Sequence, residues 1–436
     1  MQTSKLFILF CCTLALIPIS TELEITNSLS LDFPLEPVLI CWTIIGLFSF
    51  LYKPQAFKLT LQSPLFILLA IYVLWLLLNC IFSINPILSV KFLLAKCWYI
   101  IPFCLIFPSF IQNTKKHWTY IGLSLCLPML VLVTITIVRH ATTGFSFIGI
   151  NKSLYPFFRN HVNYSALLVC LLPIAYSLYT STPKESKQKK IILFALSLSL
   201  IALILAYSRG AWLVATTALV IPYIIHRKKI TVLLVVAVLL IAMGGIFLAH
   251  ENNYQQLAPN HDATIFHKKL SDHLRATVTL KDVSNAERIH RWVAGIRMVQ
   301  HKPLTGFGTN SFYPTYKGYT ISKFKTWVSN NPDHSSVHNY YLLVALEQGV
   351  PGLLIFIALL FYLLYQCQQL YHVANDSLEQ TIARTASSIL IMIMLLNFFS
   401  DLIETDKIGA LFWLICTVVI TLQIQTKKTE RQHFSL

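Results

Sequence analysis

Two arginines and one histidine lie outside the long apolar runs of a chain with few charged residues. Arg209 stands in a very short connection between two such runs, Arg288 lies in a polar segment, and His338 closely precedes a further run. A guanidinium offers paired N–H donors that fit a phosphate group. A neutral imidazole takes a proton from a hydroxyl near neutral pH. Together, these side chains suit the transfer of a group from a diphosphate to a hydroxyl.

Each of these residues also has a simpler interpretation. Arg209 fits a side chain that reaches the membrane interface, Arg288 fits an interfacial helix that contacts lipid headgroups, and His338 fits a capping or headgroup contact. Position in the sequence does not decide between the two interpretations. Four further candidates rest on their position alone: Arg159, His161, Arg291 and His334.

The sequence offers no site for a metal ion, a nucleotide or another cofactor. Its acidic residues form no aspartate cluster that would hold a divalent cation, and no Walker A or Gly-x-Ser-x-Gly motif occurs. The ten cysteines lie in or beside apolar runs without a Cys-x-x-Cys pair, so we interpret them as small membrane-embedded side chains. We therefore expect a reaction without a cofactor or a metal.

The composition places these residues in a membrane protein. Of 436 residues, 56% are hydrophobic and 12% are charged. A soluble core of this length cannot bury so many apolar side chains, which excludes a soluble enzyme, a small secreted protein and a disordered chain. We expect an all-α polytopic membrane protein with about twelve transmembrane helices. The predicted spans lie near residues 6–21, 37–52, 63–82, 92–110, 119–138, 162–180, 190–207, 210–226, 230–249, 340–365, 385–401 and 408–425.

The Lys and Arg residues predict how these helices are oriented. With the N-terminus in the cytoplasm, sixteen of them lie in inner loops and tails, whereas the short outer loops hold few. The net charge of +16 is thereby largely explained without nucleic acid. Lys5 and the run after it resemble a signal peptide, but no clear cleavage site follows, so we keep this run as a helix. Both termini are then expected in the cytoplasm.

This topology divides the chain into four segments. We expect helices one to nine over 1–249, a large periplasmic loop over 250–338, helices ten to twelve over 339–426, and a cytoplasmic tail over 427–436. The loop carries eleven Lys and Arg and several aromatic residues, and it is too long for a simple connector. Apolar residues within 286–300 recur at helical spacing and predict a short amphipathic helix there.

Several motifs in the second half of the chain resemble one family. His338-Asn339 is followed after nine residues by Gly349-x-x-Gly352, and we expect this Gly- and Pro-containing element to break the helix. The spacing resembles the ligase pattern of the bacterial O-antigen ligase / O-antigen polymerase superfamily. Three more stretches resemble elements of that superfamily: Ser208-Arg209-Gly210-Ala211-Trp212, Glu287-Arg288 with Trp292 and Pro303-x-x-Gly306-x-Gly308, and Asn160-His161-x-Asn163-Tyr164.

The resemblance implies a reaction and a location. A ligase of this superfamily moves a glycan from undecaprenyl diphosphate to a sugar hydroxyl of lipid A–core, with inversion and without a metal or nucleotide. It does so at the periplasmic face of the bacterial inner membrane, as a step of lipopolysaccharide biosynthesis in the cell envelope. By the motifs, His338 is the expected general base, and Arg209 and Arg288 are the expected diphosphate ligands.

Three other functions stay open at this point. A Wzy-type polymerase uses the same donor with a second lipid-linked glycan as acceptor, and a protein O-oligosaccharyltransferase uses a Ser or Thr. The His-Asn spacing and the ordinary length favour the ligase, and the absence of a further domain after the last span disfavours the protein-directed enzyme. A transporter for lipid-linked sugars would need ionisable residues at mid-membrane, and the predicted spans hold few besides Lys96.

Overall fold

The computed structural model describes residues 2–26, 29–257, 283–325, 336–374 and 376–434. In this part of the chain, eleven helices are long and apolar enough to cross a membrane, and a shorter apolar helix precedes them. Each of the twelve predicted spans overlaps one of these helices, so the expected all-α membrane class is confirmed. The helices are α1 (Gln2–Ile19), α2 (Leu35–Tyr52), α4 (Pro64–Phe82), α5 (Pro86–Ile100, continued by η2, Ile101–Ile106, and η3, Phe107–Ser109), α6 (Lys115–Ala141), α8 (His161–Ser181), α9 (Lys187–Leu205), α10 (Arg209–His226), α11 (Ile230–Ala249), α15 (Tyr340–Val373), α16 (Ser377–Phe399) and α17 (Asp406–Phe434).

Shorter elements connect these helices. They are β1 (Thr21–Thr26), β2 (Leu29–Phe33), η1 (Pro54–Phe57), α3 (Lys58–Leu61), α7 (Phe147–Leu154), η4 (His250–Leu257), α13 (Val283–His301), α14 (Phe312–Thr315), η5 (Tyr316–Tyr319), η6 (Ser322–Phe324) and η7 (Leu402–Glu404). Helix α13 contains the amphipathic stretch predicted at 286–300. The candidate His334 lies outside the described residues.

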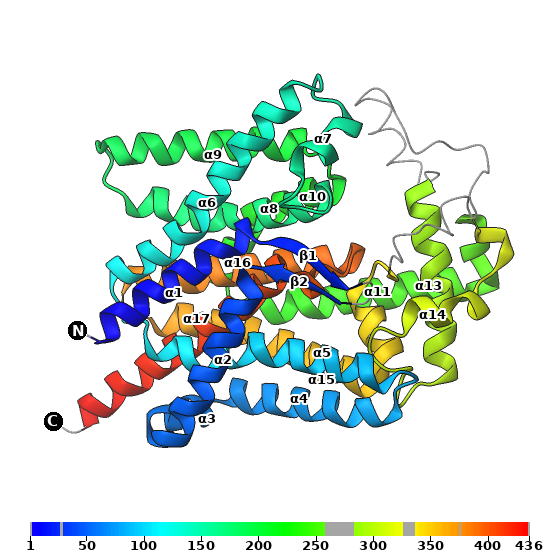
Figure 1. The fold of residues 1–436 in the computed structure, drawn as a ribbon, viewed down its shortest axis with the longest axis horizontal. Helices are drawn as coiled ribbons and strands as arrows, with labels where there is room; N and C mark the ends of the chain where they lie inside the picture. Colours follow the sequence, from blue (N-terminus) through cyan, green and yellow to red (C-terminus); the bar gives the residue numbers. More distant parts are fainter. Residues whose placement is uncertain (1, 27–28, 258–282, 326–335, 375, 435–436) are drawn as a thin grey trace.

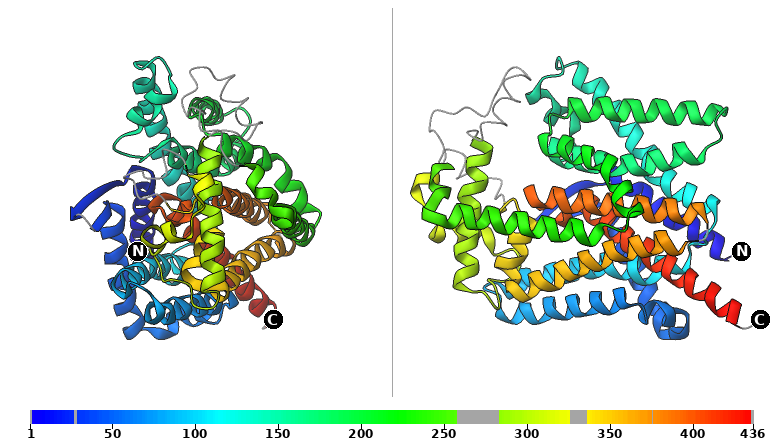
Figure 2. Two further views of the ribbon diagram at one scale, coloured as in Figure 1. Left: turned by 90° about the vertical axis from the view of Figure 1, so that its right-hand side faces the viewer. Right: turned by 180° about the vertical axis from the view of Figure 1, so that it is seen from behind.

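The long helices form one bundle with two distinct ends (Figure 1). Both termini lie at one end, whereas α13 and α14 lie at the other, as the two further views also show (Figure 2). We refer to the second as the α13 end. Because an even number of crossings returns the chain to its starting side, the common position of the termini agrees with twelve spans.

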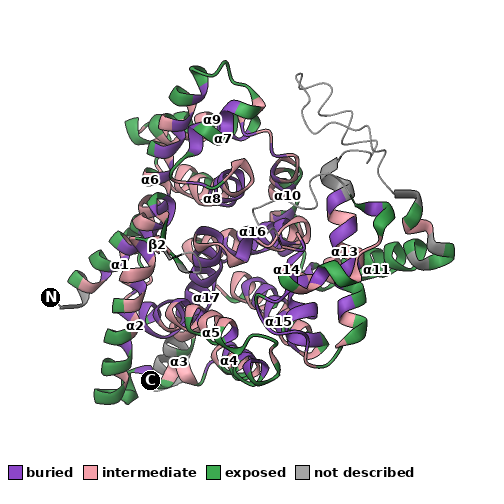
Figure 3. Ribbon diagram, turned by 45° about the vertical axis from the view of Figure 1, so that its right-hand side comes forward, coloured by how far each residue is buried: buried purple, intermediate pink, exposed green. Residues whose placement is uncertain are grey.

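Burial separates central from peripheral helices (Figure 3). The apolar window of α17 is 83% buried inside the protein, whereas that of α11 is 6% buried. Helix α17 is therefore the central element, with α16 and α15 packed beside it. The exposed apolar side chains of α11 are those of a helix that faces lipid, since a bilayer needs no polar outer face.

Local sequence explains where several helices begin. Pro64 and Pro86 stand at the first positions of α4 and α5, where a missing N–H costs nothing. Asn160 caps α8 by accepting from the backbone N–H groups of residues 162 and 163. Asn339 caps α15 by accepting from Leu342 N at 3.0 Å. The second residue of the His-Asn motif thus fixes the start of the helix that follows His338.

A two-stranded antiparallel hairpin joins α1 to α2, which the sequence analysis did not predict. Strand β1 pairs with β2, with Thr21 opposite Phe33. Its base is tied to α17, because Lys407 Nζ donates to the carbonyl oxygen of Ser20 at 2.7 Å. On β1, Glu22 forms an ion pair with Arg159. The hairpin region therefore connects the start of the bundle to the segment before α8 and to the first turn of α17.

Candidate active site

The segment after α13 is fastened to α15 by backbone hydrogen bonds. Phe307 N donates to Leu346 O at 2.9 Å, and Gly308 N donates to Glu347 O at 2.8 Å. In return, Val350 N donates to Pro303 O at 2.7 Å. These bonds lie where α15 is interrupted. They therefore satisfy backbone N–H and C=O groups of α15 that have no partner within the helix.

The motif glycines make this contact possible. Gly349 breaks α15 with φ 76° and ψ 173°, which confirms the predicted break. A Cβ on Gly349 would lie 2.2 Å from Leu304 O, and one on Gly306 (φ 66°) would lie 2.5 Å from the Glu347 carbonyl. Only glycine tolerates both the left-handed conformation and this close approach. The glycines of the two motifs therefore fit one another across the contact.

His338 lies directly before α15, in an unusual backbone conformation. Its φ is 54°, in the left-handed region that histidine adopts only occasionally. The chain on both sides is held: His338 N donates to Ser336 Oγ at 3.3 Å, and Tyr340 N donates to Ser400 O at 3.1 Å. Within the described residues, the half-buried imidazole itself makes no hydrogen bond or ion pair, so it is available for a proton.

The surroundings of His338 favour the neutral imidazole. The pKa of His338 is lowered to about 4, chiefly by burial; the charges of Asp401 and Glu287 oppose this shift, and those of Arg291 and Arg288 add to it. At neutral pH the ring therefore carries no charge and can accept a proton. The same electrostatic coupling places Arg288, a predicted diphosphate ligand, in the neighbourhood of the predicted base.

Arg291 of α13 forms hydrogen bonds that connect α13 to the segment before α15. Its side chain is fully buried, and its Nε donates to Glu287 Oε1 at 2.8 Å one helical turn away. Its Nη1 donates to the carbonyl oxygen of Ser336 at 2.8 Å, and its guanidinium lies 5.8 Å from the centre of the Tyr316 ring. Arg291 therefore links α13 to the segment that carries His338.

A second group of candidates lies around the turn between α9 and α10. Tyr207 (φ 55°) forms this turn, and its hydroxyl donates to Phe145 O at 2.7 Å. Arg209 follows as the half-buried first residue of α10. Nearby, His161 at the start of α8 shares a hydrogen bond of 3.1 Å with Asn151 of α7. Helix α7 lies on the same side of the bundle as α13 and α14 (Figure 1).

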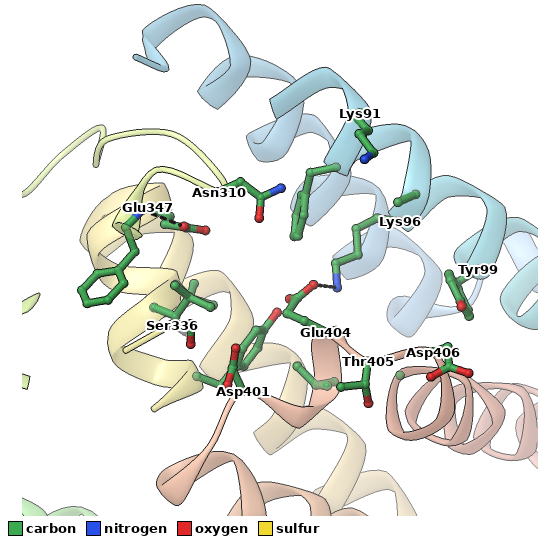
Figure 4. Close-up of a pocket in the computed structure, with 18 of the residues that line it drawn as sticks. Lys91, Lys96, Tyr99, Asn310, Ser336, Glu347, Asp401, Glu404, Thr405 and Asp406 are labelled. Atoms are coloured by element: carbon green, nitrogen blue, oxygen red, sulfur yellow. Dashed lines mark hydrogen bonds and ion pairs between the residues drawn. The ribbon is translucent and has the colours of Figure 1, made fainter. Parts of the chain in front are cut away.

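A cavity of about 320 Å³ opens beside the His338 segment, between α5, α15 and the connection from α16 to α17 (Figure 4). Ser336, Tyr340 and Asp401 line it, and the first two flank His338 in the chain. On the opposite wall, Lys96 Nζ forms an ion pair of 2.9 Å with Glu404 Oε2. Sequence reasoning missed this cavity.

Glu347 also lines the cavity, but its carboxylate has a structural partner. Its Oε1 accepts from Ser311 N at 3.1 Å, so it holds the turn that leads into α14. The only sequence signal for this region was a charged residue inside or beside an apolar run, as for Lys96. Glu404, the ion-pair partner of Lys96, lies more than 300 positions after it in the sequence, and only the fold brings Lys96 and Glu404 together.

Comparison with known proteins agrees with these motifs. No curated protein matches the chain. A family model described as O-antigen ligase matches residues 194–357, just over a third of the chain. The matched range includes Arg209, Arg288, His338 and the glycines of the α15 break. Proteins of this family are glycosyltransferase-like enzymes that act on lipid-linked glycans. Residues 194–357 therefore match the Wzy_C O-antigen ligase domain family, which O-antigen ligases and Wzy polymerases share.

Proposed function

We propose that this protein is an O-antigen ligase-like glycosyltransferase of the bacterial inner membrane. It moves a glycan from undecaprenyl diphosphate to a sugar hydroxyl of lipid A–core, with inversion at the anomeric carbon. The observation that carries the proposal is His338 directly before α15, within electrostatic reach of Arg288 of α13, at one end of a membrane helix bundle. In this proposal, the α13 end faces the periplasm and both termini face the cytoplasm.

His338 is the proposed general base. The neutral imidazole takes the proton of the acceptor hydroxyl while the hydroxyl oxygen attacks the anomeric carbon. The bond between that carbon and the diphosphate oxygen breaks, and its electron pair leaves with the diphosphate. A bound diphosphate also raises the pKa of His338, because a negative charge nearby stabilises the imidazolium. The base thus becomes stronger when the donor is in place.

Arg288 and Arg209 are the proposed ligands of the leaving diphosphate. A guanidinium binds two phosphate oxygens at once, and its charge offsets the negative charge that develops as the sugar leaves. Arg288 lies close enough to affect the charge of His338, whereas Arg209 stands at the turn before α10. The proposal requires the donor to reach both residues across the α13 end.

A Wzy-type polymerase is the second candidate, because the matched family contains both enzymes. The two differ in the acceptor, so the decisive experiment follows the glycan. In a strain that lacks the protein, a ligase function predicts glycan that accumulates on the lipid carrier and lipid A–core without long glycan. A polymerase function predicts lipid A–core that carries a single repeat unit. Restoration by the wild-type gene, but not by H338A, would connect either phenotype to this site.

A further inference from the structure

We propose that the 320 Å³ cavity beside the His338 segment is a subsite for a phosphate-free, hydroxyl-rich sugar unit of the acceptor. This inference rests on the proposed function, since it assigns the acceptor side of the same site. It adds a set of residues that are distant in sequence from the histidine and arginine motifs. Many of them lie outside the segment that matches the family model.

The lining of the cavity suits a sugar ring. Aromatic side chains of Phe92, Tyr99 and Trp413 offer flat surfaces for the C–H faces of a pyranose. Asn310 and Asp401 offer amide and carboxylate groups that bind hydroxyls, and neither side chain forms a hydrogen bond within the described residues. Pockets for small molecules combine apolar walls with a few placed polar groups in this way.

The charge of the lining argues against a diphosphate. Six carboxyl groups line the cavity, against two ammonium groups: Asp32, Glu36, Glu347, Asp401, Glu404 and Asp406, against Lys91 and Lys96. Burial raises the pKa of Asp32 to about 8, with contributions from Asp406 and Glu36, so this carboxyl is mostly protonated at neutral pH. Acidic groups still outnumber basic ones, and a diphosphate would meet like charge at short range.

The position of the cavity relative to His338 assigns it to the acceptor. Ser336 and Tyr340 flank His338 in the chain and line the cavity, whereas Arg288 approaches the same histidine from α13. Inversion requires the attacking hydroxyl and the leaving diphosphate to lie on opposite sides of the anomeric carbon. This requirement is met when the cavity holds the acceptor sugar whose hydroxyl attacks, and Arg288 binds the diphosphate that leaves from the donor.

The size of the cavity sets the extent of the ligand. Its volume of about 320 Å³ lies at the lower end of the range of about 300–1,000 Å³ for small-molecule pockets. It therefore accommodates one sugar unit and short parts of its neighbours. The remainder of a glycolipid acceptor would extend beyond the mouth of the cavity.

A pair of substitutions on α5 tests the subsite. Ala95 is half-buried and lines the cavity, so A95F fills the cavity without removing a polar group. The neighbouring Leu94 is 55% exposed and does not line the cavity, so L94F is the matched control. N310G is a second variant, because glycine keeps the positive φ of 59° while the amide is lost.

The probes are dephosphorylated core oligosaccharide, the oligosaccharide of one repeat unit, and undecaprenyl diphosphate. Calorimetry on protein in nanodiscs measures the affinity for each. We expect A95F to weaken binding of one of the two sugars by at least about tenfold, N310G to weaken it less, and L94F to leave it unchanged. Undecaprenyl diphosphate should bind all four proteins with equal affinity, which also shows that the variants are folded.

The outcomes separate the subsite from the function. If core oligosaccharide is the sugar affected, both the subsite and the ligase function are supported. If only the repeat-unit sugar is affected, the subsite stands, whereas the ligase function fails. Unchanged binding of both sugars in A95F, or loss of undecaprenyl diphosphate binding instead, would overturn the subsite whatever reaction the protein catalyses.

Discussion

Arg291 donates a hydrogen bond from Nη1 to the carbonyl oxygen of Ser336, two residues before His338, at 2.8 Å. The same guanidinium donates from Nε to Glu287 at 2.8 Å. One buried side chain thus connects two turns of α13 to the segment that carries the proposed base. The position of His338 depends on α13 as well as on α15.

Replacement of Arg291 by lysine tests this connection. An ammonium group cannot reproduce two fixed donors in one plane, so R291K should lose at least one charged hydrogen bond. Such a bond contributes about 1.5–3 kcal/mol, and we expect transfer to fall about tenfold or more, with a lower unfolding temperature. Arg297 is exposed and makes one bond of 3.3 Å to Tyr319 O, so R297K is the control and should behave as wild type. An unchanged R291K protein would refute the connection.

Arg209 and Arg288 should tolerate lysine almost as poorly as alanine. Both are proposed to bind phosphate oxygens through paired N–H donors, which lysine lacks. The measurement is transfer by R209K, R209A, R288K and R288A in membranes that contain equal amounts of each protein. Full activity of either lysine variant would show that its arginine makes only general contacts with lipid headgroups.

The fit between the two glycine motifs predicts a strong effect of a single methyl group. In G349A, the added Cβ would lie 2.2 Å from Leu304 O, and the backbone conformation of φ 76° and ψ 173°, which is essentially restricted to glycine, would itself cost about 1–3 kcal/mol. We expect a lower unfolding temperature in detergent and little transfer. Gly318 has open space at the Cβ position, so G318A is the matched control. If the two variants were equally stable, the contact would not hold the loop on α15.

The lowered pKa of His338 predicts a particular pH dependence. The neutral imidazole is the active form. We therefore expect kcat/KM for the acceptor to stay constant as pH falls and to decline only as pH approaches about 4. This constant is measured with both donor and acceptor at limiting concentration, so that it reports the free enzyme. With donor bound, the diphosphate raises the pKa, so kcat should decline at higher pH than kcat/KM. Two declines at the same pH near 6.5 would contradict the electrostatic environment described for His338.

Much of the fold follows from the sequence because a bilayer imposes simple rules. Apolar runs of sufficient length locate the helices, and the turn before Arg209 and the break at Gly349 are visible as short connections and as Gly and Pro. The hairpin of β1 and β2 was missed, although polar and apolar residues alternate in part of it. Two short strands in a connection give a weak signal beside long apolar runs.

The site was only partly predictable for a different reason. The motifs identify His338, Arg288 and the glycines, and the structure brings Arg288 into the electrostatic neighbourhood of His338. The structural role of Arg291 and the pairing of Lys96 with Glu404 depend on contacts between distant segments. No periodicity or spacing encodes those contacts. The joint action of Arg209 and Arg288 on one diphosphate stays a prediction.

The most direct test of the central claim is the turnover of H338A with purified lipid-linked donor and lipid A–core acceptor. Loss of the general base alone predicts transfer slower by about 10²–10⁴-fold, while undecaprenyl diphosphate binds as it does to wild type. Retained binding distinguishes loss of the base from loss of the fold. Wild-type turnover in H338A would contradict the assignment of His338 as the base.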